Sequence, residues 1–125
     1  MTARSALLLA SLSGVLAVVF GAFGVHALRG RLSPEALWLW HTAVEYQFYH
    51  ALALLAAGLW LKFAPAPGLT SACWAFAAGI VLFCCSLYLL ALGAPRAIGA
   101  ITPFGGLSWI AGWLLLARAA WRASV

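Results

Sequence analysis

Four long runs of hydrophobic residues, separated by short polar or turn-forming segments, dominate the sequence. The first run, Ser5 to Leu28, holds no Asp, Glu, Lys or Arg and lies between Arg4 and Arg29. A run of this length spans a bilayer, since a transmembrane helix needs about 20 residues. A signal peptide is the rival interpretation, but the run is longer than a usual signal-peptide core. We therefore expect a retained helix over residues 5–28.

Turn signals delimit the other three runs. Ser33-Pro34-Glu35 combines a capping residue, a first-turn proline and an acidic first turn, which is typical of a helix start. It predicts a second helix over residues 34–62. The turn at Pro65 to Gly68 and a second one around Gly93 then predict helices over residues 70–92 and 98–117.

The fourth predicted helix contains the segment Thr102-Pro103-Phe104-Gly105-Gly106, which indicates an interruption inside the span. A break at membrane depth is tolerated only where neighbouring helices or water satisfy the freed backbone groups. Broken helices of this kind are found at transport sites.

The composition agrees with a membrane protein. Of the 125 residues, 66% are hydrophobic and 7% are charged, whereas soluble domains carry about 25% charged residues. A small soluble fold also leaves much of its surface exposed and has no means of hiding this much apolar area. We predict an all-α integral membrane bundle of four transmembrane helices, with residues 1–125 as one transmembrane domain and both termini on the same side.

The charges define the environment of the helix ends. The net charge is +5, but the basic residues are scattered singly beside apolar runs, where they meet lipid headgroups. This pattern speaks against nucleic acid as a partner and for a multi-pass protein of the cell (inner) membrane. The positive-inside rule favours cytoplasmic termini, because four basic residues fall on the terminal side and three on the other: Arg4, Lys62, Arg118 and Arg122 against Arg29, Arg31 and Arg96.

Small residues at helical spacing predict the packing surfaces, because helices in lipid associate through close van der Waals contact. The first helix carries such a stripe, and the fourth carries glycines near its start and middle. We expect these positions to face neighbouring helices, or a second copy of the chain or a partner membrane protein: Ala10, Gly14, Ala17, Gly21 and Gly24, then Gly105, Gly106 and Gly112.

The second helix holds most of the polar residues. Glu45 is the most informative, since a carboxylate in a membrane helix is costly unless it is paired or near the interface. His41 and Tyr49 lie four residues to either side of it and share its face. Tyr46 and His50 form an adjacent face with the same spacing.

Two interpretations of this cluster stay open. One is a proton- or ligand-handling site that combines His26, His41, Glu45 and Tyr46 with Tyr49 and His50. The other is a hydrogen-bonded cluster at headgroup depth, in which Glu45 pairs with Arg29, Arg31 or His41. No two histidines have the i,i+4 spacing of a helical metal site, so we predict neither a metal nor a cofactor. Three cysteines are expected to be small buried residues: Cys73, Cys84 and Cys85.

Four ordered blocks of the sequence resemble one known family. They are residues 21–28 (GAFGVHAL), 41–52 (HTAVEYQFYHAL), 82–93 (LFCCSLYLLALG) and 99–106 (GAITPFGG), the last followed by Gly112-Trp113. The chain is similar to the small membrane proteins catalogued as domain of unknown function 423, which have a related transmembrane protein in animals. The family usually shows Phe-Ser-Gly-Ser-Leu-Tyr where this chain has Phe-Cys-Cys-Ser-Leu-Tyr at residues 83–88.

The resemblance implies a four-helix membrane fold in the plasma or inner membrane, and it supplies no activity, substrate or catalytic residue. Its blocks suggest that polar side chains from all four helices converge on one buried network, since lipid penalises unpaired polar groups. The members would be His26, Tyr46, His50, Ser86, Tyr88 and Thr102.

Three function classes follow from these features. The first is a non-catalytic accessory or interaction component of the membrane, which is the class we expect. The alternative is a small proton-coupled transporter or permeation unit that uses Glu45 and the nearby histidines. The third is an enzyme or redox carrier with a cofactor held by His26 and His50.

Overall fold

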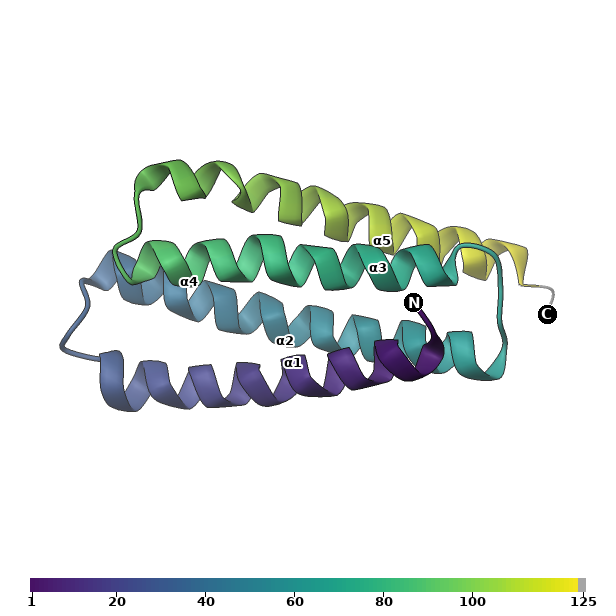
Figure 1. The fold of residues 1–125 in the computed structure, drawn as a ribbon, viewed down its shortest axis with the longest axis horizontal. Coiled ribbons are helices and arrows are strands. Elements are labelled where there is room, and N and C mark those ends of the chain that lie inside the picture. The colour runs from purple at the N-terminus through teal and green to yellow at the C-terminus, as the bar shows by residue number, and fades with distance from the viewer. Residues whose placement is uncertain (124–125) are drawn as a thin grey trace.

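The computed structural model describes residues 1–123. Two short π-helical segments, Gly24–Leu28 and Ile80–Cys84, extend the first helix and join the third to its continuation. The labelled elements therefore form four rods (Figure 1), and the prediction of an all-α, four-helix fold is confirmed. Their α-helical parts are α1 (Ala3–Phe23), α2 (Pro34–Phe63), α3 (Leu69–Gly79), α4 (Cys85–Ala91) and α5 (Thr102–Arg122).

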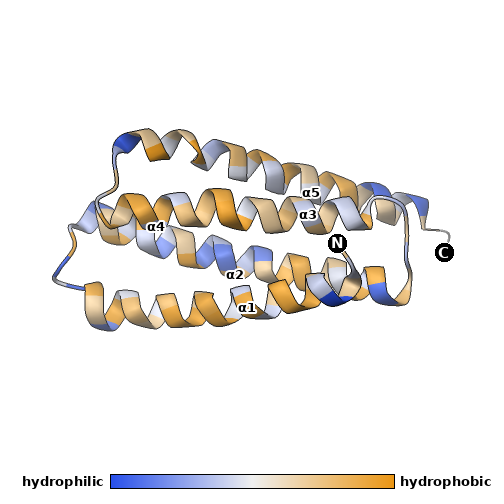
Figure 2. Cartoon of the chain, viewed as in Figure 1, coloured by the Kyte–Doolittle hydropathy of each residue, from blue (hydrophilic) through white to orange (hydrophobic). Residues whose placement is uncertain are grey.

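Three of the rods are long and apolar enough to cross a membrane: Ala3–Leu28, Leu69–Ala91 and Arg96–Arg122. The remaining rod, α2, carries hydrophilic residues in its first half (Figure 2). Its 30 residues correspond to about 45 Å, more than the ~30 Å hydrocarbon core. Because α2 packs against both α1 and the α3–α4 rod, part of its polar surface is covered by protein.

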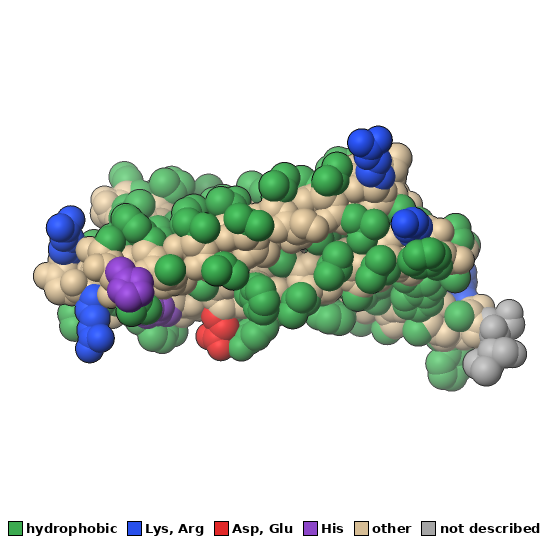
Figure 3. All heavy atoms as spheres, turned by 90° about the horizontal axis from the view of Figure 1, so that it is seen from below, with side chains coloured by type: hydrophobic (Ala, Val, Ile, Leu, Met, Phe, Trp, Pro, Cys, Tyr) green, Lys and Arg blue, Asp and Glu red, His purple; other side chains and the backbone are tan. Residues whose placement is uncertain are grey.

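The rods follow one another in an open row. Helix α1 packs on α2, α2 packs on α3 and α4, and α5 packs on α3, whereas α1 and α3 touch only slightly. Figure 1 shows the chain running back and forth so that both ends of the described segment lie at the same end of the molecule. Basic side chains lie toward both ends, and hydrophobic ones cover the length between them (Figure 3).

Local sequence explains how the first two helices begin. The Thr2 and Ser5 side chains form a reciprocal capping box at the start of α1. At the start of α2, the Ser33 hydroxyl accepts a hydrogen bond from the Ala36 amide at 3.2 Å. Pro34 occupies the first turn, where a missing N–H costs nothing. The predicted helix start at Ser33 is therefore confirmed.

The fourth rod differs from the sequence prediction. Its irregular part is a 3-10 segment, Arg96–Ala100, which precedes the α-helix. Helix α5 begins at Thr102 and continues without a break to Arg122. The predicted interruption around Pro103 is therefore wrong, because Pro103 lies in the first turn, where its ring and missing N–H are accommodated.

The small-residue stripe of α1 faces α2, with one exception. Ala10 and Ala17 are buried, and Gly24 allows close approach, since a Cβ there would lie 2.8 Å from Cδ1 of Trp40. Gly21 also approaches α2. A Cβ at Gly14, by contrast, would meet no atom within 4 Å. Gly14 therefore does not pack against another helix of this chain, and its predicted role at a contact with a second copy or a partner protein stays a prediction.

The glycines of α5 also divide into two kinds. A Cβ at Gly105 would lie 2.5 Å from the backbone nitrogen of Phe83, and one at Gly112 would lie 3.0 Å from the Phe76 ring. A Cβ at Gly106 would meet no atom of the described chain within 4 Å, so Gly106 does not pack against another helix of the bundle. One position along a helix turns the side chain by about 100°, and this carries Gly106 out of the seam.

Candidate functional site

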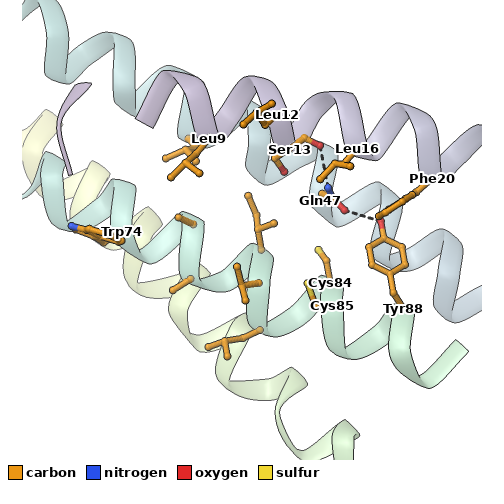
Figure 4. Close-up of a pocket in the computed structure, with 16 residues that line it drawn as sticks. Leu9, Leu12, Ser13, Leu16, Phe20, Gln47, Trp74, Cys84, Cys85 and Tyr88 are labelled. Atoms are coloured by element: carbon orange, nitrogen blue, oxygen red, sulfur yellow. Dashed lines mark hydrogen bonds between the residues drawn. The ribbon is translucent and has the colours of Figure 1, made fainter. Parts of the chain in front are cut away.

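A lateral groove of about 700 Å³ separates α1 from the α3–α4 rod. It exists because α1 packs on α2 and makes few contacts with α3, so that α2 forms the floor between two walls. One wall consists of leucines of α1 and the other of apolar residues of the π segment and its neighbours, as Figure 4 shows. The polar floor of the groove consists of three residues, Ser13 from α1, Gln47 from α2 and Tyr88 from α4.

A buried chain of hydrogen bonds connects these residues across three helices. The Tyr88 hydroxyl of α4 donates to Oε1 of Gln47 at 2.7 Å. The Gln47 side-chain nitrogen of α2 donates to the backbone carbonyl of Ser13 in α1 at 3.0 Å (Figure 4). Gln47 is only 4% exposed. An amide at this depth is costly unless it is hydrogen bonded, so this chain fixes the positions of α1, α2 and α4 relative to one another.

The Ser13 hydroxyl is the exception in this floor. Its oxygen is buried and has no hydrogen-bond partner among the described residues, although Ser13 lines the groove. The nearby Ser11 behaves as serines in helices usually do, since its hydroxyl donates to the Leu7 carbonyl at 2.9 Å. A buried polar atom without a partner calls for an explanation.

The π segment Ile80–Cys84 shapes the opposite wall of the groove. Such segments insert extra width into a helix and are frequent at functional sites. Cys73 and Cys84 are buried as expected, but Cys85 is exposed and lines the groove. The prediction of burial is therefore wrong for Cys85, because α1 stands away from this side of the rod.

Ser86 and Thr102 form a second polar contact, on the other side of the α3–α4 rod. Their hydroxyl oxygens lie 2.7 Å apart, and the Ser86 hydroxyl lies 2.8 Å from the Phe83 carbonyl, to which it donates. Since Thr102 is the first residue of α5, this contact ties the start of α5 to α4.

His50 belongs to a third group, which is built from aromatic rings. Its ring stacks on Trp109 at a centroid distance of 3.6 Å and an interplanar angle of 2°. Trp113 Nε1 lies 3.4 Å from His50 Nε2 and can only donate. His50 Nε2 is then the acceptor, so Nδ1 carries the hydrogen that it donates to the Tyr46 carbonyl at 2.8 Å. Both ring nitrogens are therefore engaged in hydrogen bonds.

Glu45 points away from the bundle. Its carboxylate accepts a hydrogen bond from the Tyr49 hydroxyl at 2.5 Å, and His41, Glu45 and Tyr49 are all exposed. Within the described part of the chain, Glu45 pairs with none of its three predicted partners, Arg29, Arg31 and His41. The two arginines lie beyond the end of α1. Glu45 lies eleven residues into α2, about 16 Å from its start.

His26 stands apart from all of these groups. It lies exposed in the π segment at the end of α1. His50 sits near the level of Ser13, since its neighbour Gln47 contacts Ser13, so about three to four helical turns separate the two histidines. Among residues 1–123, no three metal-ligating side chains come together.

The prediction of one convergent polar network is therefore wrong. The residues divide among the Tyr88 chain, the Ser86–Thr102 contact, the His50 stack and the isolated His26. The physical reason is angular. Successive residues of a helix point about 100° apart. Glu45 therefore points to the outside, Tyr46 toward α5, and Gln47 toward the groove.

Sequence reasoning missed Ser13 and Gln47 as site residues. Gln47 lay within a recognised block, and a signal for it existed, because a neutral amide at the middle of a membrane helix needs a partner inside the protein. Ser13 gave no comparable signal. A single hydroxyl is tolerated in any membrane helix by bonding back to the preceding turn, and only the structure shows that it does not do so here.

Comparison with known proteins agrees with this architecture. The family model described as protein of unknown function (DUF423) matches residues 20–106. The chain is 43% identical over 115 residues to the UPF0382 membrane protein YwdK of Bacillus subtilis, a match that covers 91% of this chain and 94% of that protein. It is 44% identical over 110 residues to the UPF0382 membrane protein SH2409 of Staphylococcus haemolyticus, covering 88% of this chain and 89% of that protein.

A third relative, the UPF0382 membrane protein SAB0533 of Staphylococcus aureus, is 40% identical over 116 residues, which cover 93% of this chain and 94% of that protein. No solved structure matches the chain. The extent of these matches and the four hydrophobic rods lead to one conclusion: the chain belongs to the DUF423, or UPF0382, family of multi-pass membrane proteins.

Proposed function

We propose that the protein is a non-catalytic accessory component of the membrane, which acts by binding another membrane constituent along its lateral surface. The observation that carries the proposal is the use of the polar groups. Gln47, Tyr88, Ser86 and Thr102 hydrogen bond to one another or to backbone groups between helices. Groups engaged in this way hold the rods in place, and the large groove that they leave is lined mainly by apolar side chains.

The row of helices also supports this proposal. Helix α1 packs mainly on α2, and α5 packs on the α3–α4 rod and meets α2 through Trp109 and Trp113. Long apolar faces therefore remain exposed, including that of α1 with Leu12 at 60% and Val18 at 64% exposure. Lipid covers such faces, and so does a second copy or a partner membrane protein. We place the protein in the cell membrane with cytoplasmic termini, which is the orientation that its flanking basic residues favour.

Two measurements test the accessory role. A native mass spectrum of the protein, extracted gently from its own membrane, is expected to show a second constituent retained in stoichiometric amount. Proteoliposomes containing the purified protein are expected to move protons no faster than empty liposomes when a pH gradient is applied. A protein that carries protons, or one that retains nothing, would contradict the proposal.

Proton-coupled permeation is a second candidate function, and Glu45 is the observation that favours it. Its carboxyl group lies in the first half of α2, on the outer face, with Tyr49 as its hydrogen-bond partner. Carboxylates in membrane proteins mark proton pathways where they face the bundle interior or a water-filled cavity. A second copy packed against α2 would place the outward-facing Glu45 in such an interior. The predicted break at Pro103, which would also have supported transport, is absent from α5.

The Glu45→Gln variant distinguishes the two functions. We expect it to fold with unchanged or slightly higher stability, because an amide still accepts the Tyr49 hydrogen bond and carries no charge into lipid. We also expect partner retention in the native mass spectrum to stay as in the wild type. A proton flux in wild-type proteoliposomes that disappears in Glu45→Gln, but persists in Glu35→Gln as the matched control, would establish the permeation unit instead.

A further inference from the structure

We propose that the groove between α1 and the α3–α4 rod binds a neutral, membrane-dissolved molecule that carries a carbonyl group, with the carbonyl oxygen directed at Ser13. This inference rests on the proposed function, because it names the class of membrane constituent that the protein holds. The size of the groove, its lining, the donors in its floor and its depth in the bilayer all support this ligand class.

The size and lining of the groove define the body of the ligand. Its volume of about 700 Å³ falls within the range of about 300–1,000 Å³ that is usual for small-molecule sites. Leu9, Leu12 and Leu16 of α1 lie across the groove from Cys84 and Cys85 (Figure 4), and the lining also includes Ile80 and Val81 of the π segment. The lining contains no Asp, Glu, Lys, Arg or His. An uncharged molecule with a large apolar part therefore fits, and an ionised one does not.

The floor of the groove supplies hydrogen-bond donors. The Ser13 hydroxyl has no partner, and a rotation about its Cα–Cβ bond turns it toward the groove that the residue lines. Gln47 has two amide hydrogens, one of which goes to the Ser13 carbonyl, while its oxygen is already occupied by Tyr88. The Ser13 hydroxyl and the second Gln47 N–H are both donors at the floor, and one carbonyl oxygen with its two lone pairs can accept from both.

The depth of Ser13 narrows the class further. Ser13 is the eleventh residue of the apolar rod Ala3–Leu28, so it lies about 15 Å from one end and about 22 Å from the other. Ser13 is therefore near the middle of the hydrocarbon. A phospholipid places its ester carbonyls and charged headgroup at the surface, and only its chains reach this level. A neutral molecule without a charged headgroup, such as an alkyl quinone or a diacylglycerol, can bring a carbonyl to it.

The test measures binding of defined probes to the full-length protein by native mass spectrometry. The probes are a decyl-substituted benzoquinone, dioctanoylglycerol and decylbenzene, which has an apolar tail but no oxygen. We expect at least one carbonyl probe to bind as a single copy and more tightly than decylbenzene. The probe that binds identifies the source of the carbonyl as a quinone ring or an ester.

Two variants locate the bound probe. Ser13→Ala loses no hydrogen bond in the free protein and is expected to fold normally. Its affinity for the carbonyl probe should fall by about 3- to 10-fold, which corresponds to the loss of one hydrogen bond. Ala78→Phe fills the groove, since Ala78 lines it and is exposed, and it should abolish binding. Ala56→Phe is the matched control, because Ala56 is an exposed alanine of α2 outside the groove lining, and it should leave binding unchanged.

Cys85 provides a second readout. It is exposed and lines the groove, whereas Cys84 and Cys73 are buried, so an apolar maleimide should label Cys85 first and a bound probe should slow that labelling. Binding that is equal for decylbenzene and unaffected by Ser13→Ala would overturn the inference, and so would the absence of any bound carbonyl probe. If the protein retains a companion protein but binds no probe, this inference is wrong and the accessory role stands. If the protein binds a probe and also shows a proton flux that depends on Glu45, the accessory role is wrong and the ligand site stands.

Discussion

Replacing Gly105 with alanine will destabilise the protein, whereas the same replacement at the adjacent Gly106 will not. An added Cβ at Gly105 would lie 2.5 Å from the backbone nitrogen of Phe83 and 2.9 Å from its Cα. Backbone atoms have no rotamer by which to move aside, so α5 and the π segment must separate. Overpacking of this kind costs about 1–3 kcal/mol of unfolding free energy.

The control at Gly106 has the opposite expectation. A Cβ there meets no atom within 4 Å, and alanine is the better helix former by up to about 1 kcal/mol. The measurement is equilibrium unfolding in mixed micelles, followed by the helical circular dichroism signal. Equal stability of the two variants would show that α5 does not approach the π segment as closely as the structure places it.

Hydropathy was sufficient to predict the rods, because a chain that crosses lipid has to satisfy its backbone within each helix. The helix start at Ser33 could be predicted for a similarly local reason, since its capping hydroxyl and the following proline act within one turn. Hydropathy does not predict which rods lie next to one another. Nothing in the spacing of Gly105 and Gly106 says which of them faces the π segment Ile80–Cys84, and the two differ because only one side of α5 packs on that rod.

The candidate site was harder to predict for the same reason. The 100° step along α2 separates Glu45, Tyr46 and Gln47 in any helix, but which of them is buried depends on where α1 and α4 lie. The π segment adds to this difficulty. Residues 70–92 show uniform hydrophobicity, which does not reveal a wider turn at Ile80–Cys84, and that turn affects which side of the rod faces the groove.

Loss of the Gln47 amide is expected to have the second large effect on stability. Gln47→Leu keeps the volume of the side chain but leaves the buried Tyr88 hydroxyl without its acceptor and the Ser13 carbonyl without this donor. An unsatisfied buried polar group costs about 1–3 kcal/mol. Tyr88→Phe should cost a comparable amount, because it leaves Oε1 of Gln47 without a donor.

The double variant Gln47→Leu/Tyr88→Phe is the informative measurement. It removes both members of the bond, so no orphaned partner remains between them, and its loss of unfolding free energy should be smaller than the sum of the single losses. Hydrogen bonds between membrane helices give coupling energies of about 0.6–1.7 kcal/mol in such cycles. Ser11→Ala is a control with almost no expected effect, since its hydroxyl bonds only to its own helix at Leu7. If the two single losses simply add, the amide and the hydroxyl do not act on each other, and a cause other than the buried chain of hydrogen bonds must hold α4 against α1 and α2.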